Sequence, residues 1–243
     1  MGVIFVSDLL IMTPGPTEVS EEVRRAMSQK ITNPDLDPEF FDFYLDVSSK
    51  LQQVLKTKND VIIMSGEGIL GLESACASLI EPGDKVLVLD NGIFGRGFAD
   101  FAALYGADVI RWEFPYDKEI DIDKLEEKLE DENDFKFATF VHCETPTGII
   151  NNAEKITTLL NEHNILSVVD SVSAIGGVPI KVDDWGIDII LGGSQKCLSV
   201  PPGLTFMSVS DDAWDSINNR ESPVRGYYTN LQLWQNWYEE KYF

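Results

Sequence analysis

Short apolar segments alternate with amphipathic segments along most of this 243-residue chain. The apolar segments are rich in Val, Ile and Leu and end at Gly, Asp or other turn formers, a pattern that predicts buried strands. The amphipathic segments repeat their apolar positions every three or four residues, which predicts helices. Strands are expected at 60–64, 85–90, 108–114, 135–142, 165–170, 187–193 and 204–210. Helices are expected at 20–27, 38–55, 68–80, 94–106, 121–131 and 153–164.

This alternation of near-continuous apolar strands with helices predicts an α/β fold. Strands of this composition form a mostly parallel sheet, here of the seven-stranded type, with helices on both faces. We expect an extended segment over residues 1–20, followed by one large domain over 21–243. Ligands of such sheets bind beyond the carboxyl ends of the strands, so the residues that follow each strand are the candidates for chemistry.

The chain is strongly acidic, since 19 Lys and Arg against 41 Asp and Glu give a formal net charge of −22. This charge argues against a nucleic-acid partner, because phosphate backbones bind basic surfaces. No apolar run is long enough to span a bilayer, and the first residues lack the basic start of a signal peptide. Three cysteines without metal-ligand spacing suit reduced thiols, and two histidines are too few for a histidine-rich metal site. We therefore expect a cytoplasmic protein with no metal, no membrane and no nucleic-acid partner.

Small residues follow the first expected strand in the stretch SGEGILG at 65–71. Glycines let backbone N–H groups approach a ligand, and the helix that begins here would add its N-terminus, so the stretch is a candidate phosphate site. A simple turn between a strand and a helix explains the same glycines. Glu67 fits poorly in a phosphate loop because a carboxylate repels a phosphate, so its side chain must point away or bond elsewhere.

Other strand ends carry side chains that suit chemistry, each with a plainer explanation. Phe94 could stack on a flat cofactor or belong to the core. Glu144 and Thr145 could bind a ligand or cap a turn. Asp170 ends an apolar strand, where a carboxylate is costly unless it meets a cation, although it could also cap a turn. Lys196, in GGSQKCLSVPPG, could form a Schiff base with an aldehyde or be an ordinary loop lysine.

Together these features match the needs of pyridoxal phosphate. That cofactor requires a phosphate cradle, a ring that stacks on it, a carboxylate that keeps its pyridine nitrogen protonated and a lysine that binds its aldehyde. Each feature alone is weak evidence, but all of them occur at strand ends of one expected sheet.

The stretches that contain these residues resemble the class V, fold-type I pyridoxal-phosphate-dependent aminotransferases, close to the alanine–glyoxylate and serine–pyruvate branch. The resemblance is carried by MTPGPTEVSEEVRRAM, NGIFGRGF, ETPTGI, VVDSVSAIGG and GGSQKCLSVPPGL, which together cover nearly the whole chain. It implies pyridoxal 5'-phosphate as cofactor and transfer of an amino group from alanine or serine to glyoxylate or another small 2-oxo acid. It also implies a homodimer.

The resemblance assigns roles to individual residues of this chain. Lys196 matches the lysine that binds the cofactor aldehyde, and Asp170 matches the carboxylate at the pyridine nitrogen. Phe94 matches the stacking aromatic, Val172 matches the residue on the other ring face, and Thr145 matches a hydroxyl near the ring oxygen. The remaining matches are Gln195 near the phosphate, Gly68 and Ile69 in the phosphate loop, and Gly15 beside the substrate carboxylate.

Two features depart from the family pattern. Glu67 stands where the family has a small or hydroxyl residue that contacts the phosphate. The chain also stops at residue 243, whereas the family continues into a small C-terminal domain that supplies an arginine for the substrate carboxylate. We therefore expect a large domain whose transaminase activity is impaired by truncation.

Three alternatives stay open at this stage. The chain could be an inactive or cofactor-binding fragment without turnover. It could be similar to a cysteine desulfurase, although that branch typically has a histidine where Gln195 precedes the lysine. It could also be another class V transaminase, because those acting on 2-aminoethylphosphonate and ureidoglycine share much of this pattern.

Overall fold

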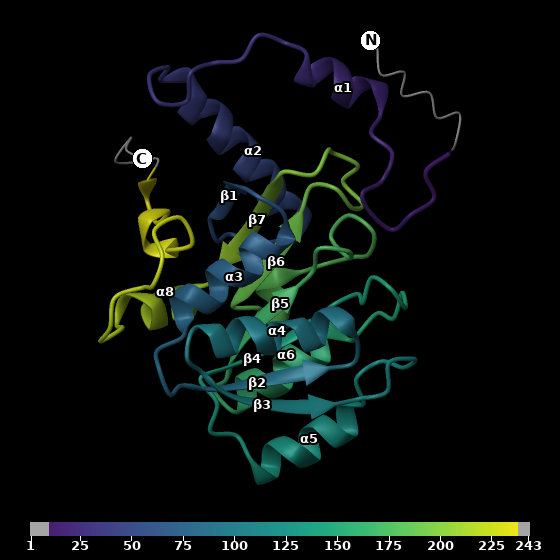
Figure 1. The fold of residues 1–243 in the computed structure, drawn as a ribbon, viewed down its shortest axis with the longest axis vertical. Helices are drawn as coiled ribbons and strands as arrows, with labels where there is room; N and C mark the ends of the chain where they lie inside the picture. The colour runs from purple at the N-terminus through teal and green to yellow at the C-terminus, as the bar shows by residue number, and fades with distance from the viewer. Residues whose placement is uncertain (1–9, 238–243) are drawn as a thin grey trace.

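A computed structural model describes residues 10–237, which form one mixed sheet with helices packed around it (Figure 1). Within these residues the sheet has seven strands in the order β1-β7-β6-β5-β4-β2-β3. The α/β prediction is confirmed, and every expected strand forms to within two residues at either end. The strands are β1 (Val61–Ser65), β2 (Lys85–Asp90), β3 (Asp108–Glu113), β4 (Phe137–Val141), β5 (Leu166–Asp170), β6 (Ile189–Gly193) and β7 (Leu204–Val209).

The strand directions place six carboxyl ends at the same edge of the sheet. The pairs β2–β3, β2–β4, β4–β5 and β5–β6 are parallel, while β7 is antiparallel to both of its neighbours, β1 and β6. The segment 194–203 that joins β6 to β7 is shorter than the dozen or so residues that a parallel crossover needs, so β7 returns in the opposite direction.

Helices cover both faces of the sheet, as the apolar strands require. Residues of β2 alternate between two clusters, with Val86 and Val88 facing α3 and α4 and with Leu87 and Leu89 facing α5 and α6. Each such side chain contributes about 1.5–3 kcal/mol when it leaves water. The helices are α1 (Glu21–Met27), α2 (Glu39–Leu55), α3 (Gly68–Leu79), α4 (Ile93–Leu104), α5 (Ile122–Asp131), α6 (Ala153–Glu162), α7 (Val182–Trp185) and α8 (Asp211–Asn218), with a 3-10 turn, η1 (Leu231–Leu233).

Short elements account for the differences from the sequence prediction. The sequence analysis did not predict α7, α8 or η1. α7 and η1 have four and three residues, too few for a helical periodicity to show, whereas α8, with eight residues, was missed although the seven-residue α1 was found. Phe94 lies in the first turn of α4 rather than at the end of β2 itself. Of the helices in the described part of the chain, none combines the length and apolar character that crossing a bilayer requires.

The segment that precedes α2 arches away from the sheet (Figure 1). Helix α1 buries none of its residues, and Met12, Ile31 and Leu36 are 76–84% exposed. This segment, residues 10–38, is called the N-terminal arm below. Its hydrogen bonds to the sheet region are made by Thr17.

Candidate active site

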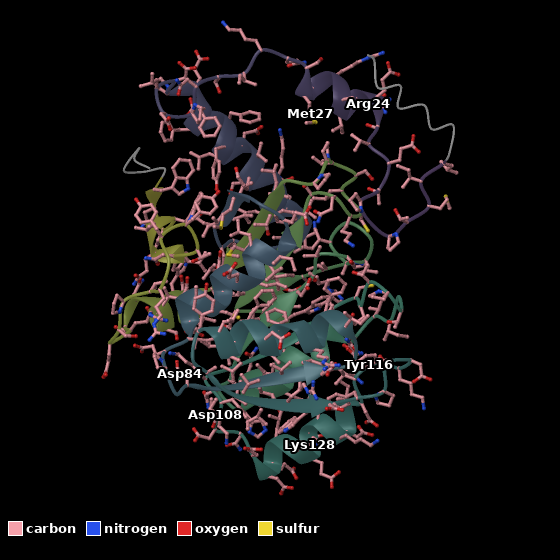
Figure 2. The ribbon with its side chains drawn as sticks, viewed as in Figure 1. Arg24, Met27, Asp84, Asp108, Tyr116 and Lys128 are labelled. Carbon is pink, nitrogen blue, oxygen red and sulfur yellow. The ribbon has the colours of Figure 1, made fainter. Side chains whose placement is uncertain are left out.

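The carboxyl-terminal edge of the sheet gathers the loops that the sequence singled out. Figure 2 shows the two edges: Asp84 and Asp108 lie where β2 and β3 begin, and Tyr116 lies beyond the opposite ends of these strands. On this second side, β5 ends at Asp170 and β6 leads into the loop of Lys196.

A cavity of about 190 Å³ lies at this edge. All nine residues that the sequence analysis proposed for the site line it, although they come from six separate segments of the chain. Pro16, Glu67 and Leu72 line it as well. The nine are Gly15, Gly68, Ile69, Phe94, Thr145, Asp170, Val172, Gln195 and Lys196.

Lys196 is held in a tight turn and is 8% exposed. The Ser199 N–H donates to the Lys196 carbonyl at 2.9 Å, and the hydroxyl of Ser194 donates to the Pro201 carbonyl at 2.7 Å. The N-terminal arm closes the other side, since the Thr17 hydroxyl donates to the Lys196 carbonyl at 2.9 Å. The lysine backbone is therefore fixed from two directions.

Gly15 permits the arm to lie directly on the lysine side chain. A Cβ at this position would come within 2.2 Å of Lys196 Cδ, so no other residue fits without displacing the lysine. Gly68 has the same role on the opposite wall, where a Cβ would lie 2.5 Å from Val172 Cγ2. The cavity walls thus meet at distances that only glycine allows.

Asp170 is 5% exposed and has no ion pair among residues 10–237. Its carboxylate accepts a hydrogen bond from the Val172 N–H at 2.9 Å. Burial raises the pKa of Asp170 to about 6; the Val172 N–H and the charge of Lys196 act against this shift, and Glu144 adds to it. A carboxylate in this setting is suited to meet a cationic group of a ligand.

Glu144 has a structural role that the sequence analysis left unassigned. Its fully buried carboxylate accepts hydrogen bonds from the Gly95 N–H at 2.6 Å and from the Phe94 N–H at 3.3 Å. A Cβ at Gly92 would lie 2.2 Å from Glu144 Cδ, so this glycine makes room for the carboxylate. Glu144 therefore caps the N-terminus of α4 and fixes the turn that carries Phe94.

Thr145 follows Glu144 and hydrogen-bonds across the cavity rim. Its hydroxyl lies 2.5 Å from the Ser173 hydroxyl, on the loop that follows Asp170. The hairpin that presents Thr145 is closed by the Gly148 N–H, which donates to the Glu144 carbonyl at 2.7 Å.

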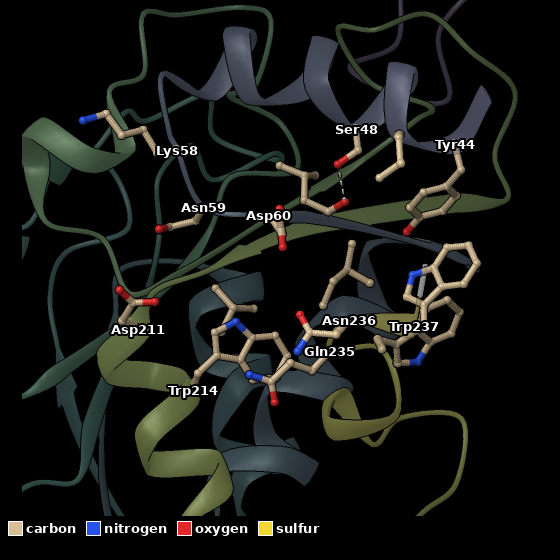
Figure 3. A pocket seen from close by; sticks show the side chains of 15 residues that line it. Tyr44, Ser48, Lys58, Asn59, Asp60, Asp211, Trp214, Gln235, Asn236 and Trp237 are labelled. Atoms are coloured by element: carbon tan, nitrogen blue, oxygen red, sulfur yellow. Dashed lines mark hydrogen bonds between the residues drawn. The ribbon is translucent and has the colours of Figure 1, made fainter. Parts of the chain in front are cut away.

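A second cavity, of about 370 Å³, is lined by residues of α2, β1 and α8 and by 234–237 (Figure 3). Its polar groups bond to the adjacent strand: the Ser48 hydroxyl donates to the Val61 carbonyl at 2.8 Å, and the Tyr44 hydroxyl accepts from the Ile63 N–H at 2.6 Å. Burial raises the pKa of Tyr44 to about 12. None of the nine candidate residues lies here, and the groups present serve the packing of α2 on the sheet.

The sheet order and the lysine-containing cavity define the large domain of a fold-type I aminotransferase. The sequence model of the family described as Aminotransferase class-V matches residues 13–224, and the chain belongs to this family. A crystal structure of alanine–glyoxylate aminotransferase from Nostoc sp. superposes with a TM-score of 0.95 at 32% identity, covering 100% of this chain and 64% of that one.

Two curated relatives show how much of a family member the chain represents. The pyridoxamine–pyruvate transaminase of Mesorhizobium japonicum is 35% identical over 97% of this chain and 60% of its own length. The alanine–glyoxylate aminotransferase of Rattus norvegicus is 32% identical over 93% of this chain and 55% of its own length. The chain therefore spans somewhat more than half the length of these relatives.

The buried carboxylate predicts a pH-dependent stability. The pKa of Asp170 in the folded chain, about 6, lies above that of an unfolded aspartate. The contribution of Asp170 to the free energy of unfolding is therefore most favourable below about pH 4 and is lost as the pH rises through about 6. Asp170→Asn, with no ligand added, should therefore raise the free energy of unfolding at about pH 7.5 by about 1–3 kcal/mol, and by much less near pH 4.5. Urea unfolding at the two pH values measures this, and an equal effect at both would contradict it.

The cap on α4 predicts a cost for losing Glu144. Glu144→Ala leaves the buried Gly95 N–H and the partly buried Phe94 N–H without an acceptor and should lower the free energy of unfolding by about 1–3 kcal/mol, whereas Glu144→Gln, which keeps one acceptor, should recover part of the loss. Glu126→Ala, at an exposed position of α5, is the matched control and should change stability by less than about 0.5 kcal/mol. Equal values for Glu144→Ala and the control would show that the cap has no energetic role.

Proposed function

We propose that this chain is the cofactor-binding part of an aminotransferase that moves an amino group from a small amino acid, alanine or serine, to glyoxylate or another small 2-oxo acid. The observation that carries this proposal is the cavity that is lined both by the buried Lys196 and by the buried Asp170, which has no ion pair among residues 10–237. The relatives support it by name, since they include alanine–glyoxylate, L-aspartate–glyoxylate and pyridoxamine–pyruvate transaminases.

Pyridoxal 5'-phosphate is the cofactor of class V aminotransferases, and most of this cavity suits its ring. The Lys196 amine would hold the aldehyde, and Asp170 would face the pyridine nitrogen and keep it protonated. Phe94 and Val172 would flank the ring, and the Thr145 hydroxyl would donate near the ring oxygen. When bound, the protonated ring withdraws electrons from the substrate carbon.

The protein would also supply the proton chemistry. With its Nζ free, Lys196 would be the base that removes the α-proton of the substrate amino acid. The hydrogen bonds from Thr17 and Ser199 to the Lys196 carbonyl fix the lysine backbone for this role. Gly15, at the lysine, would leave space beside the substrate carboxylate.

The end of the cavity beside α3 suits the phosphate of this cofactor less well. Gly68 and Ile69 begin α3, and their N–H groups together with Gln195 would surround the 5' substituent. Glu67 is also among the residues that line this cavity, and its negative charge does not suit a phosphate.

We infer a homodimer from the N-terminal arm. Its exposed apolar side chains, among them Met12, Ile31 and Leu36, have no cover within residues 10–237, and a second copy of the chain would supply one. The division into a segment 1–20 and a large domain 21–243 stays a prediction. Residues 1–9 and 238–243 lie outside the described part of the chain, and residues 21–38 lie in the N-terminal arm. Cys76, Cys143 and Cys197 are free thiols, which supports a cytoplasmic location.

A ureidoglycine–glyoxylate exchange is the second candidate. The transaminase of that name from Bacillus subtilis is 37% identical over 90% of this chain. Both candidates use the same residues for the cofactor, so they differ in the amino donor alone. A cysteine desulfurase is less well supported, because its solved structures are only 14–16% identical and share the fold alone.

The role of Lys196 is testable by spectroscopy and labelling. The chain mixed with pyridoxal 5'-phosphate or with pyridoxal should show the visible absorbance of a lysine-bound aldehyde. Borohydride reduction should then attach one of these two ligands covalently to the peptide that contains Lys196, which raises the mass of that peptide accordingly. Lys196→Ala should lose both signals, while Lys124→Ala, at an exposed position, should keep them. Labelling of the wild-type chain at other lysines only would overturn the proposal.

A further inference from the structure

Glu67 stands at the entrance of the helix that would receive the cofactor's 5' substituent. It is the N-cap residue of α3, and its side chain makes no capping bond to the helix. The residue is solvent-exposed and belongs to the lining of the cavity. The carboxylate is therefore available to a ligand rather than used by the fold.

The cavity has little positive charge with which to hold a phosphate. Among the described residues that line it, the charged side chains are Glu67, Asp170 and Lys196. Lys196 is the residue that the proposed function assigns to the aldehyde. A phosphate, which carries between one and two negative charges at neutral pH, would meet the Glu67 carboxylate with no other cation from the described lining.

A buried acceptor in the same wall points to a ligand that donates. Gln195 is 7% exposed, lines the cavity, and its Oε1 has no hydrogen-bond partner. It lies beside Gly193 and Val172, and Val172 packs against Gly68 at the start of α3. An orphaned buried acceptor is satisfied by an N–H or O–H group, whereas a doubly ionised phosphate offers only acceptors.

We propose that this site takes the unphosphorylated ring, pyridoxal or pyridoxamine, in preference to pyridoxal 5'-phosphate, with Glu67 as the residue that determines this specificity. The inference rests on the proposed function, since it assumes that Lys196 receives the aldehyde. A 5'-hydroxymethyl group is neutral, can donate its O–H to Glu67 or to Gln195 Oε1, and can accept from the N–H groups that begin α3. When the single O–H is donated to Gln195 Oε1, the orphaned acceptor has a partner, and Glu67, which is solvent-exposed, can bond to water.

The test compares two ligands on matched variants. Pyridoxal and pyridoxal 5'-phosphate are titrated into the wild-type chain, Glu67→Ser, Glu67→Gln and Glu126→Ser, and each dissociation constant is read from tryptophan fluorescence and from the visible absorbance of lysine-bound ligand. Glu67→Gln removes the charge and keeps the shape, and Ser is a favourable N-cap, so the variants preserve α3. Glu126→Ser makes the same change of net charge on α5, far along the chain from the cavity.

The dissociation constant of the wild-type chain for the phosphate ester should be at least about tenfold higher than that for pyridoxal. Both Glu67 variants should reduce this ratio of dissociation constants about tenfold, mainly by improving binding of the ester. Glu126→Ser should leave the ratio unchanged, and added salt should narrow it in the wild type because screening weakens the repulsion. Tighter binding of the ester by the wild type, or a ratio that Glu67 variants do not move, would overturn the inference while leaving the proposed function standing. Failure of both aldehydes to label Lys196 would remove the proposed function and this inference with it.

Discussion

Asp170 is a carboxylate buried at the end of a strand that cannot move toward water. β5 is hydrogen-bonded to β4 on one side and to β6 on the other, so the carboxylate stays where the sheet places it. Its burial raises its pKa to about 6, which means that folding alone does not satisfy it at neutral pH. The site is therefore built around a charge that a ligand is needed to neutralise, and Lys196 on the next loop supplies the group that would tether that ligand.

Close packing converts this charge into a defined cavity. Gly15 lets the N-terminal arm lie against Lys196, Gly68 lets α3 approach Val172, and Gly92 admits the Glu144 carboxylate beneath the turn of Phe94. A single methyl group at any of these positions would meet heavy atoms at 2.2–2.5 Å. Three pairs of segments, each pair distant in the sequence, thus pack closely at the same edge of the sheet, which keeps the cavity small and its walls rigid.

The sequence predicted the strands well because each one is a short apolar run that ends at a turn former, and the candidate site residues, several of which came from the family resemblance alone, line one cavity. The direction of β7 depends on the length of the segment that joins it to β6, a quantity that the apolar pattern does not report. The sequence left open whether Glu144 binds a ligand or caps a turn, because its partner, the Gly95 N–H, lies 49 residues earlier in the chain. Contacts of that kind appear only when the sheet has brought β2 and β4 side by side. The roles given to the nine lining residues remain predictions.

The two ends of the cavity suit different chemical groups of a ligand. The end at Asp170 requires a cationic group, since a buried carboxylate without one is costly. The end at α3 offers the Glu67 carboxylate and the orphaned Gln195 Oε1, which require donors, beside helix N–H groups, which require an acceptor. A hydroxyl group is both donor and acceptor and carries no charge, whereas a phosphate satisfies the helix and opposes the carboxylate. In this proposal Glu67, together with Gln195 Oε1, separates the two forms of the same ring, without any change to the lysine and aspartate that would bind it.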